Sequence, residues 1–448
     1  MTASTGGSPA PARSEAAAQL QLAIPLAAQQ LGFQLMGSVD TAFLGHYSEG
    51  ALAASGVGNS LLFAITSVGM GIVMGLDSIV PQAIGAGRLD DARRGLAAGI
   101  KLAVLVGLAA TVLVVLSPLL LFAIDVPAEV STDARIYIHL RSLGIVPFLL
   151  SIALRSYLAA RSTTRPLIVA VIAGNLANVV IDVALIFGVP ALGIPAMGVA
   201  GAAIATVVVQ VVIIAVYFVS ARALDGGEPR PPARRADMVA IVRYGAPVGG
   251  QLFAEVGIFG LATVLAASIG TLPAAAHSIA LTLASFTFAM AIGIGSATSV
   301  RVGHAIGAGD RALARHRGVL GLGLGVGGMA LFAALFVIIP APVARLFTND
   351  PAVVLATVPL LQIAALFQLS DGAQAIAAGA LRGLGDTRAT FVGNVIGHYA
   401  IGLPISLGLA FGMGLGAPGL WWGLSAGLTV TAAYLIVRFL ARTRPAAN

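Results

Sequence analysis

The chain has 448 residues, of which 58% are hydrophobic and 10% are charged, and its formal net charge is +7. This composition is typical of a polytopic membrane protein, because soluble domains contain about 25% charged residues. The absence of cysteine excludes disulfide frameworks, thiolate metal sites and thiol nucleophiles. Lys101 is the only lysine and the arginines lie in short connections, so the positive charge indicates membrane topology rather than nucleic-acid binding.

The chain is predicted to begin with a disordered cytoplasmic leader, residues 1–15, which lacks the charged start and apolar stretch of a signal peptide. Crossing about 30 Å of hydrocarbon takes about 20 apolar residues. Apolar windows of this length lie near 17–45, 51–80, 94–123, 133–160, 166–190, 197–221, 238–269, 274–302, 316–346, 352–381, 388–413 and 417–440. The sequence therefore predicts an all-α polytopic membrane protein with twelve transmembrane helices.

The two halves of the chain repeat each other. Pro25 and Pro247 lie 222 residues apart in similar apolar runs, and the same offset relates PQAIGAGRLDDARRG to GHAIGAGDRALARHRG. We therefore expect two six-helix lobes with the same topology, related by an axis along the membrane normal. The predicted boundaries are an N-lobe at 16–222, a cytoplasmic interlobe linker at 223–237, a C-lobe at 238–441 and a cytoplasmic tail at 442–448.

The distribution of Lys and Arg predicts the orientation of the helices. Of the 25 such residues, 22 lie in the connections after every second helix or in the termini, and only Arg135, Arg141 and Arg345 lie on the other side. Short cytoplasmic loops carry the excess of Lys and Arg. Both termini are therefore predicted to be cytoplasmic.

Two acidic residues lie inside apolar helices of the first half. A carboxylate in a membrane helix costs about 2.5–3.5 kcal/mol on insertion scales, so it normally faces a bundle interior or a watery cavity. Asp40 lies in the first window, and Asn175, Asn178 and Asp182 share one face of the fifth. With Thr206 of the sixth window they predict an oxygen-rich site for H⁺ or Na⁺. The alternative interpretation is hydrogen bonding between packed helices, which we favour for Asn175.

The second half carries its own acidic pair. Gln251 and Glu255 lie one turn apart in the seventh window, and Asp371 and Gln374 share a sector of the tenth. A proton or Na⁺ ion at Glu255 and Asp371 changes the local charge by one. Phe367, one turn before Asp371, offers either cation–π surface to a lipophilic cation or plain packing.

No motif indicates an enzyme or a nucleotide-driven pump. The glycine-rich strings follow no strand and precede no Gly-Lys-Ser/Thr, so close helix packing explains them better than a phosphate loop. The six histidines have no metal-ligand spacing and form no Ser-His-Asp set. His398, one turn after Asn394, is a candidate for hydrogen bonding in the bundle or for a proton relay. No cofactor is expected beyond the coupling ion, H⁺ or Na⁺.

Several motifs resemble the multidrug and toxic compound extrusion (MATE) family. They are MGSVDTAFLGHY, the two AIGAG connections, FAEVGIF and SDGAQAIAAGALRGLGDTR, and the resemblance covers the chain after residue 15. The pair Glu255 and Asp371 is similar to the glutamate–aspartate pair of the NorM-like branch of this family. The resemblance implies a first-lobe ion site at Asp40, Asn178, Asp182 and Thr206. Some sodium-type relatives carry a tyrosine where this chain has Phe367, which argues against sodium.

The resemblance implies a monomeric antiporter of the bacterial inner membrane. It would export organic cations and amphipathic compounds in exchange for H⁺ or Na⁺ by alternating access. The main alternative is a flippase for lipid-linked oligosaccharide of the same superfamily, which would need basic residues in its cavity to hold pyrophosphate. An ion channel is a further alternative, but it does not predict acids placed separately in two repeated halves.

Overall fold

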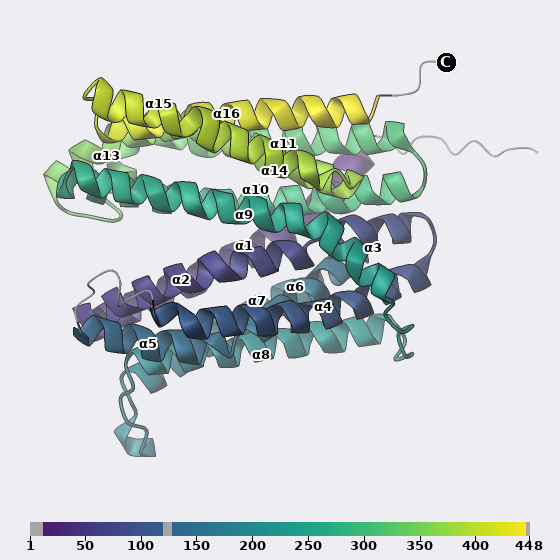
Figure 1. The fold of residues 1–448 in the computed structure, drawn as a ribbon, viewed down its shortest axis with the longest axis horizontal. Helices are drawn as coiled ribbons and strands as arrows, with labels where there is room; N and C mark the ends of the chain where they lie inside the picture. Colours follow the sequence, from purple (N-terminus) through teal and green to yellow (C-terminus); the bar gives the residue numbers. More distant parts are fainter. Residues whose placement is uncertain (1–11, 120–127, 445–448) are drawn as a thin grey trace, which may run out of the picture.

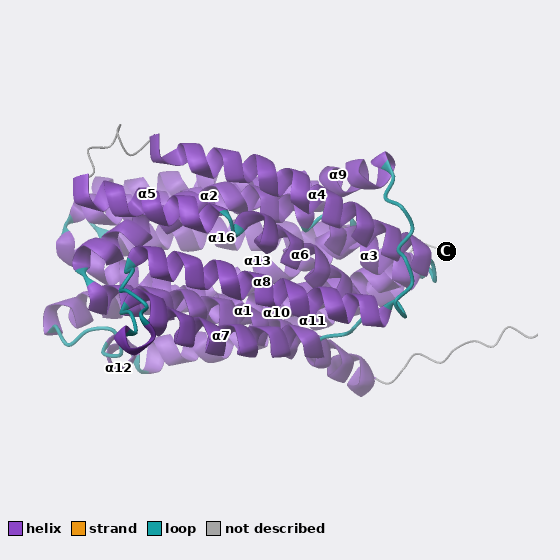
Figure 2. Cartoon of the chain, turned by 90° about the horizontal axis from the view of Figure 1, so that it is seen from below, coloured by secondary structure: helices purple, strands orange, loops and turns teal. Residues whose placement is uncertain are grey.

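The computed structural model describes residues 12–119 and 128–444, which form long helices joined by short loops (Figure 1). Within these residues the only β structure is a single bridge between Val189 and Ile194, in the hairpin-like loop that projects at the lower left of Figure 1. Figure 2 accordingly shows helices and loops without a strand. The predicted all-α class is confirmed.

The described residues of the first lobe form eight α-helices. They are α1 Ala12–Tyr47, α2 Glu49–Val73, α3 Leu76–Gly85, α4 Leu89–Leu116, α5 Ala128–Ser142, α6 Ile145–Ala160, α7 Arg165–Ile186 and α8 Val199–Leu224. The pairs α2–α3 and α5–α6 each correspond to one predicted window, 51–80 and 133–160, and extend beyond it. The end of the window at 94–123 lies partly outside the described residues.

The second lobe also contains eight α-helices. They are α9 Arg235–Ile269, α10 Thr271–Gly307, α11 Arg311–Ile338, α12 Pro340–Ala344, α13 Pro351–Leu384, α14 Thr387–Val395, α15 Leu403–Leu407 and α16 Ala417–Arg442. Two π-helical turns, Ile396–Gly402 and Gly408–Gly412, join α14 and α15 into one continuous span that ends at Gly412.

The number of membrane spans agrees with two six-helix lobes. Ten helical segments in the described residues are long and apolar enough to cross a membrane, and the pair α5–α6, bent by 44°, makes eleven. Helix α1 has 36 residues, which is long enough to cross, but five glutamines lower its hydropathy. With α1 as the twelfth, each lobe has six spans.

Two of the expected continuous helices are interrupted for identifiable reasons. The break between α2 and α3 contains Gly75, where a Cβ atom would lie 2.2 Å from the carbonyl oxygen of Ile241 on α9. The π-helical turn Ile396–Gly402 precedes Pro404, which has no N–H to donate to the carbonyl four residues earlier. Neither interruption shows in hydrophobic periodicity, because both lie within apolar sequence.

Three predicted boundaries need correction. Helix α1 begins at residue 12, so the last four residues of the predicted leader 1–15 are helical, and the others lie outside the described residues. The linker between α8 and α9 is 225–234 rather than 223–237, because the Asp237 carboxylate accepts the Arg234 N–H and starts α9 there. Helix α16 extends to Arg442, one residue into the predicted tail.

The two lobes pack together on the side where α1 begins and α16 ends, which we call the terminal side. The largest hydrophobic core combines N-lobe residues such as Val73 with Ile241, Val248 and Ile294 of the C-lobe. On the opposite side each lobe has a separate core, one around Ile138 and one around Trp421. In Figure 1 the lobes accordingly converge toward the right.

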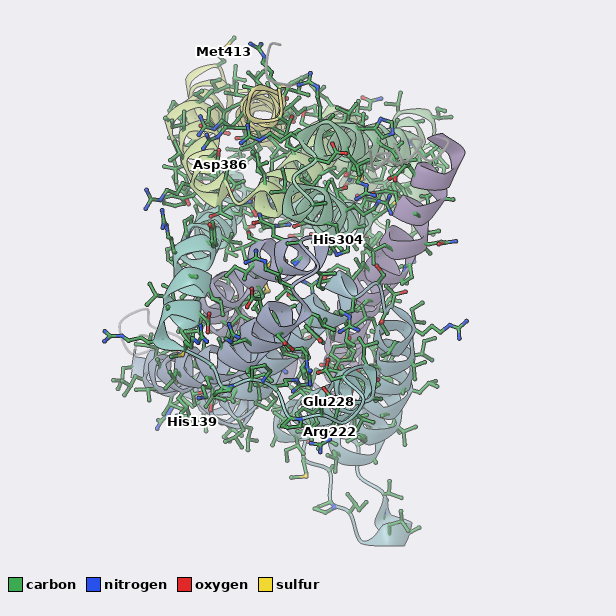
Figure 3. All side chains as sticks on the ribbon, turned by 90° about the vertical axis from the view of Figure 1, so that its right-hand side faces the viewer. His139, Arg222, Glu228, His304, Asp386 and Met413 are labelled. Atoms are coloured by element: carbon green, nitrogen blue, oxygen red, sulfur yellow. The ribbon has the colours of Figure 1, made fainter. Side chains whose placement is uncertain are left out.

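Polar contacts across the lobe interface lie on the same terminal side. Gln19 donates to Thr298 at 2.8 Å, and Ser78 donates to the carbonyl oxygen of Arg382 at 2.6 Å. A ring nitrogen of His304 lies 2.9 Å from the carbonyl oxygen of Ala160, and Figure 3, which views this side, places His304 between the lobes. The described residues therefore adopt a conformation that is closed on the terminal side.

An ion-pair cluster joins the start of α1 to the C-lobe. Glu15 pairs with Arg301 of α10 and with Arg317 of α11, whose Nε lies 3.0 Å from Glu15 Oε2. The hydrogen bond from Arg317 is the main cause that lowers the pKa of the Glu15 carboxyl below its usual range. The charged form of Glu15 therefore stabilises the closed terminal side.

Replacing Glu15 by Gln is expected to lower the thermal unfolding midpoint at pH 7. Because the pKa of Glu15 is lowered in the folded state, its contribution is present above the unfolded pKa and is lost as the pH falls through the folded value. Unfolding midpoints of wild type and variant should therefore differ at pH 7 and converge at strongly acidic pH. Glu49→Gln is the control, since Glu49 is exposed and forms no ion pair with the described residues. A difference of the same size at both pH values would contradict the prediction.

Candidate functional site

The N-lobe cluster is centred on Asp40 in the second half of α1. The carboxyl group is 9% exposed, and its Oδ2 accepts a hydrogen bond from Thr206 Oγ1 of α8 at 3.0 Å. Its Oδ1 is buried without a hydrogen-bond partner. The structure thus brings Asp40 and Thr206 together although 166 residues separate them.

Asp182 and Asn178 complete this cluster from α7. Both side chains are fully buried, and because they lie one turn apart they face the same way. The Asp182 carboxyl group interacts electrostatically with Asp40. Neither the two carboxyl oxygens of Asp182 nor the amide oxygen of Asn178 has a hydrogen-bond partner in the described residues.

The chemistry of this cluster suits a small hard cation or a proton. Asp40, Asp182 and Asn178 present four unpaired buried oxygen atoms, and hard cations prefer carboxylate and amide oxygens. Two carboxylates buried together repel each other, so taking up a positive charge relieves the repulsion. In the described residues no three His, Cys, Asp or Glu side chains group as a transition-metal site would require.

Tyr137 of α5 is a neighbour of this cluster that sequence reasoning did not single out. Its ring is buried, and its hydroxyl interacts electrostatically with both Asp40 and Asp182. The Arg141 guanidinium lies 5.8 Å from the centre of the Tyr137 ring. The only signal in the sequence was a tyrosine within a predicted transmembrane window, and such a tyrosine does not by itself indicate a site.

Asn175 does not join the acids. Its Nδ2 donates to the carbonyl oxygens of Gly32 on α1, at 3.1 Å, and of Val171, at 2.8 Å. The side chain therefore ties α7 to α1, in line with the packing interpretation rather than with a place in the acidic cluster.

The C-lobe cluster is built around Glu255 of α9. Its Oε1 accepts hydrogen bonds from three side-chain amides, those of Gln251 at 3.0 Å, Gln374 at 2.9 Å and Asn394. Three N–H donors on one oxygen compensate the negative charge of a carboxylate. The environment of Glu255 thus differs from that of Asp182, whose oxygens are unpaired.

Asp371 and His398 lie beside Glu255. The Asp371 side chain on α13 is buried and interacts electrostatically with Glu255, as does His398. Both ring nitrogens of His398 are buried without a hydrogen-bond partner in the described residues. His398 lies in the π-helical turn before Pro404, a kind of irregularity that is frequent at functional sites.

Phe367 is enclosed by other aromatic rings. It is 2% exposed, and its ring lies edge-on to Phe259 at 6.1 Å and to Trp421 at 5.4 Å. The ring is therefore packed against other rings in this conformation, and a contact with a lipophilic cation stays a prediction. Phe259 is only partly buried and also contacts the His398 ring at 6.2 Å, so it is the aromatic residue that lines the acidic cluster.

Two further residues emerged only from the structure. Asn394 had no assigned role, yet it is one of the three donors to Glu255. Trp421 lies on α16, distant in sequence, and its Nε1 donates to His277 Nδ1 at 3.2 Å. Helical spacing relates residues within one helix, so it gave no signal for contacts made between helices.

The geometry defines a two-lobed helical membrane protein with a separate buried acidic cluster in each lobe. The MatE family model matches residues 25–184 and again residues 247–407, so it matches each lobe once. The chain belongs to the MatE family, a family of membrane transporters and not of enzymes. The predicted family resemblance is confirmed.

Similar proteins support this assignment along nearly the whole chain. The chain is 36% identical to the probable multidrug resistance protein NorM of Deinococcus radiodurans, with 97% of this chain and 98% of the relative covered. It is 35% identical to the multidrug resistance protein NorM of Burkholderia vietnamiensis, with 94% and 93% covered.

Solved structures share the fold. The eukaryotic MATE transporter AtDTX14 is 22% identical, with a TM-score of 0.86 over 96% of this chain and 98% of that one. An outward-facing multidrug resistance MATE transporter of the MOP superfamily is 18% identical, with a TM-score of 0.86 over 96% of each chain. The fold is therefore that of MATE transporters.

Proposed function

We propose that the protein is a multidrug efflux antiporter that exports organic cations and amphipathic drugs in exchange for H⁺ or Na⁺. The observation that carries the proposal is the buried pair Asp40 and Asp182 within a transporter fold, because Asp40 Oδ1 and both carboxyl oxygens of Asp182 lack a hydrogen-bond partner. NorM relatives, which cover nearly the full length, carry the name multidrug resistance protein. In this proposal a coupling ion and a cationic drug each compensate the negative charge of buried acids, and the two are bound in different conformational states.

The coupling step in this proposal is exchange of positive charge. An entering H⁺ or Na⁺ binds between Asp40 and Asp182 and neutralises one of their two negative charges. Thr206 and Asn178 supply further oxygen ligands. Binding of the ion therefore favours the conformational state that releases the drug. Moving a two-state equilibrium from 1:99 to 99:1 takes about 5.5 kcal/mol of differential binding. Relief of repulsion between two buried carboxylates is a direct source of such a difference.

The C-lobe cluster is the second candidate for coupling and for substrate binding. Three side-chain amides donate to Glu255, whereas its neighbours Asp371 and His398 form no side-chain hydrogen bond with the described residues. A cationic drug near Phe259 would meet the charges of Glu255 and Asp371. We therefore propose that this lobe contributes mainly to binding the cationic substrate.

The terminal side is proposed to face the cytoplasm of a bacterial cell, since it carries most of the arginines. In this orientation the described conformation is closed to the cytoplasm, as in an outward-facing state. We propose a monomer that alternates with an inward-facing state by rocking of the two lobes. An oligosaccharide-lipid flippase is less favoured, because the two clusters are acidic and would repel pyrophosphate.

Ethidium efflux from proteoliposomes tests the proposed function. Vesicles that contain the purified protein are given either a pH gradient or a Na⁺ gradient, and the rate is compared with that of protein-free vesicles. One of the two gradients should accelerate efflux and so identify the ion. If neither gradient accelerates efflux of ethidium or of a second organic cation, the antiporter proposal is wrong.

A further inference from the structure

A cavity of about 270 Å³ lies on the terminal side of the N-lobe, away from both acidic clusters. Helices α4 and α8 and the interlobe linker 225–234 form its walls. Its lining residues are Ala97, Ile100, Lys101, Phe218, Arg222, Glu228, Pro229 and Arg230. Figure 3 shows Arg222 and Glu228 close to each other at this end of the N-lobe.

Two of the lining cations are free to bind an anion. Lys101, the only lysine in the chain, and Arg222, in the last turn of α8, are both exposed. Within residues 12–119 and 128–444 neither side chain forms an ion pair or a hydrogen bond. Glu228 does not neutralise them, because its carboxylate pairs with Arg93 at 3.0 Å. The positive charges of Lys101 and Arg222 in the cavity are therefore not neutralised by a neighbouring carboxylate.

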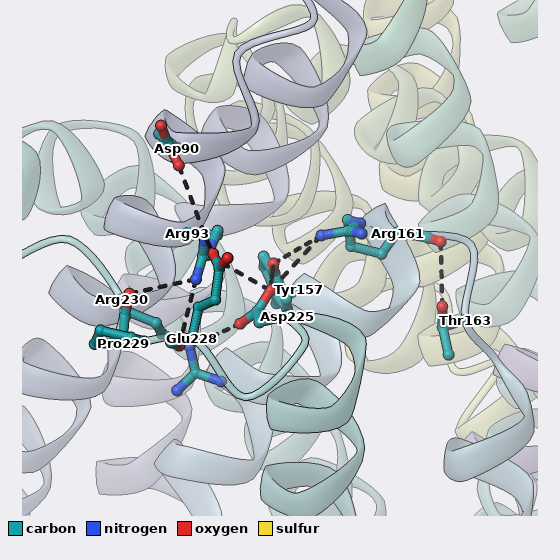
Figure 4. A network of polar contacts seen from close by, with 9 residues as sticks. All are labelled: Asp90, Arg93, Tyr157, Arg161, Thr163, Asp225, Glu228, Pro229 and Arg230. Carbon is teal, nitrogen blue, oxygen red and sulfur yellow. Dashed lines mark hydrogen bonds and ion pairs between the residues drawn. The ribbon is translucent and has the colours of Figure 1, made fainter.

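The linker is held over the cavity by a buried carboxylate. The side chain of Asp225 is 1% exposed, and it pairs with Arg230 at 3.1 Å and accepts a hydrogen bond from Tyr157 of α6 (Figure 4). Arg230, fixed in this way, lies with its guanidinium 5.7 Å from the centre of the Phe218 ring. The linker therefore forms a wall of the cavity that ion pairs and a hydrogen bond hold in place.

Apolar surfaces lead from the two cations along the outside of the lobe. On α4, Leu105, Leu108 and Val112 continue the face of Lys101 at helical spacing, and each is more than half exposed. On α8, Phe218 and Val211 continue the face of Arg222 in the same way and are also exposed. Since these helices cross the membrane, the two faces contact lipid chains. A ligand in the cavity can therefore place acyl chains on the same faces.

We infer that this cavity binds the phosphate head group of an anionic phospholipid. Lys101 and Arg222 contact the phosphate oxygens, the linker covers the head group, and the acyl chains follow α4 and α8. Basic pockets between transmembrane helices at the membrane surface commonly bind anionic lipid head groups. The inference does not depend on which ion drives transport.

Lipid retention by the full-length protein tests this assignment. The protein is purified in detergent and titrated with phosphatidylglycerol or phosphatidylcholine, and bound lipid is measured by native mass spectrometry. For the variant Lys101→Gln/Arg222→Gln we expect roughly 30-fold weaker binding of phosphatidylglycerol, since each cation near an anionic lipid is worth about 1 kcal/mol. Binding of phosphatidylcholine should be weak and unchanged.

The control variant Arg165→Gln/Arg311→Gln removes the same charge from the same side. Both arginines are exposed at helix starts and do not line the cavity. Equal loss of phosphatidylglycerol in the two variants would overturn the inference, because it would indicate general surface charge. Displacement of the lipid by millimolar inorganic phosphate would overturn it as well, since the site would then belong to a free anion. Retention by the control and loss from the cavity variant, without such displacement, would support it.

Discussion

Replacing Asp40 by Asn should abolish the acceleration of ethidium efflux by an ion gradient, while the protein still folds. The amide keeps the size of the side chain and the acceptor for Thr206 at Asp40 Oδ2, but it removes one of two repelling charges. The second carboxylate, Asp182, then has no partner whose repulsion an entering cation relieves. We expect the loss of a coupling free energy of about 1–3 kcal/mol, or about 5- to 150-fold in the effect of the gradient. Efflux rates with and without the gradient measure it.

Glu255→Gln is the comparison variant, because it makes the same replacement of a carboxylate by an amide in the other acidic cluster. Glu255 is held by three amides, so its replacement should weaken drug binding while the gradient still accelerates efflux. Thermal unfolding midpoints of the variants check that both have folded. Loss of coupling in Glu255→Gln with normal coupling in Asp40→Asn would move the coupling site to the C-lobe.

Replacing Gly245 by Val should prevent the lobes from closing on the terminal side. A Cβ atom at Gly245 on α9 would lie 1.9 Å from the carbonyl oxygen of Ile72 on α2, in the other lobe. Overpacking costs about 1–3 kcal/mol, which corresponds to a shift of about 5- to 150-fold toward the state that is open on this side. Drug efflux should fall because one of the two alternating states is lost.

The absence of cysteine makes this shift measurable with one introduced thiol. Ser299 is buried on the terminal side, where its hydroxyl donates to the carbonyl oxygen of Asp77 at 3.4 Å. A Ser299→Cys thiol should therefore react slowly with a maleimide in the wild-type background and faster with Gly245→Val. Gly260→Val is the control, since a Cβ at Gly260 on the same helix meets no atom within 4 Å. Equal labelling rates in the three proteins would contradict the prediction.

The amino-acid sequence determined the helical class, the repeated halves and the positions of the acids within the helices. Apolar windows and the 222-residue offset depend on residue spacing along the chain, and the two matches of the family model begin at this same offset. A buried carboxylate is costly enough in lipid that Asp40 and Asp182 were recognisable one at a time.

Contacts between helices were decided only by the tertiary structure. The rotation and tilt of each helix placed Asn394 on Glu255, enclosed Phe367 between Phe259 and Trp421, and directed Asn175 to backbone carbonyls. Hydrophobic periodicity predicts which face of a helix is buried, but it does not predict which neighbouring helix covers that face.

The closed terminal side and the covered cavity also arise from long-range packing. Close glycine contacts such as Gly245 against Ile72, and ion pairs such as Glu15 with Arg317, join residues that lie far apart in the chain. The sequence predicted the linker only as a cytoplasmic connection between the lobes, whereas the structure shows that the buried Asp225 holds it beside Lys101 and Arg222. Sequence spacing determined the helices and their acids, whereas the fit of surfaces from the two lobes and the linker determined which groups meet.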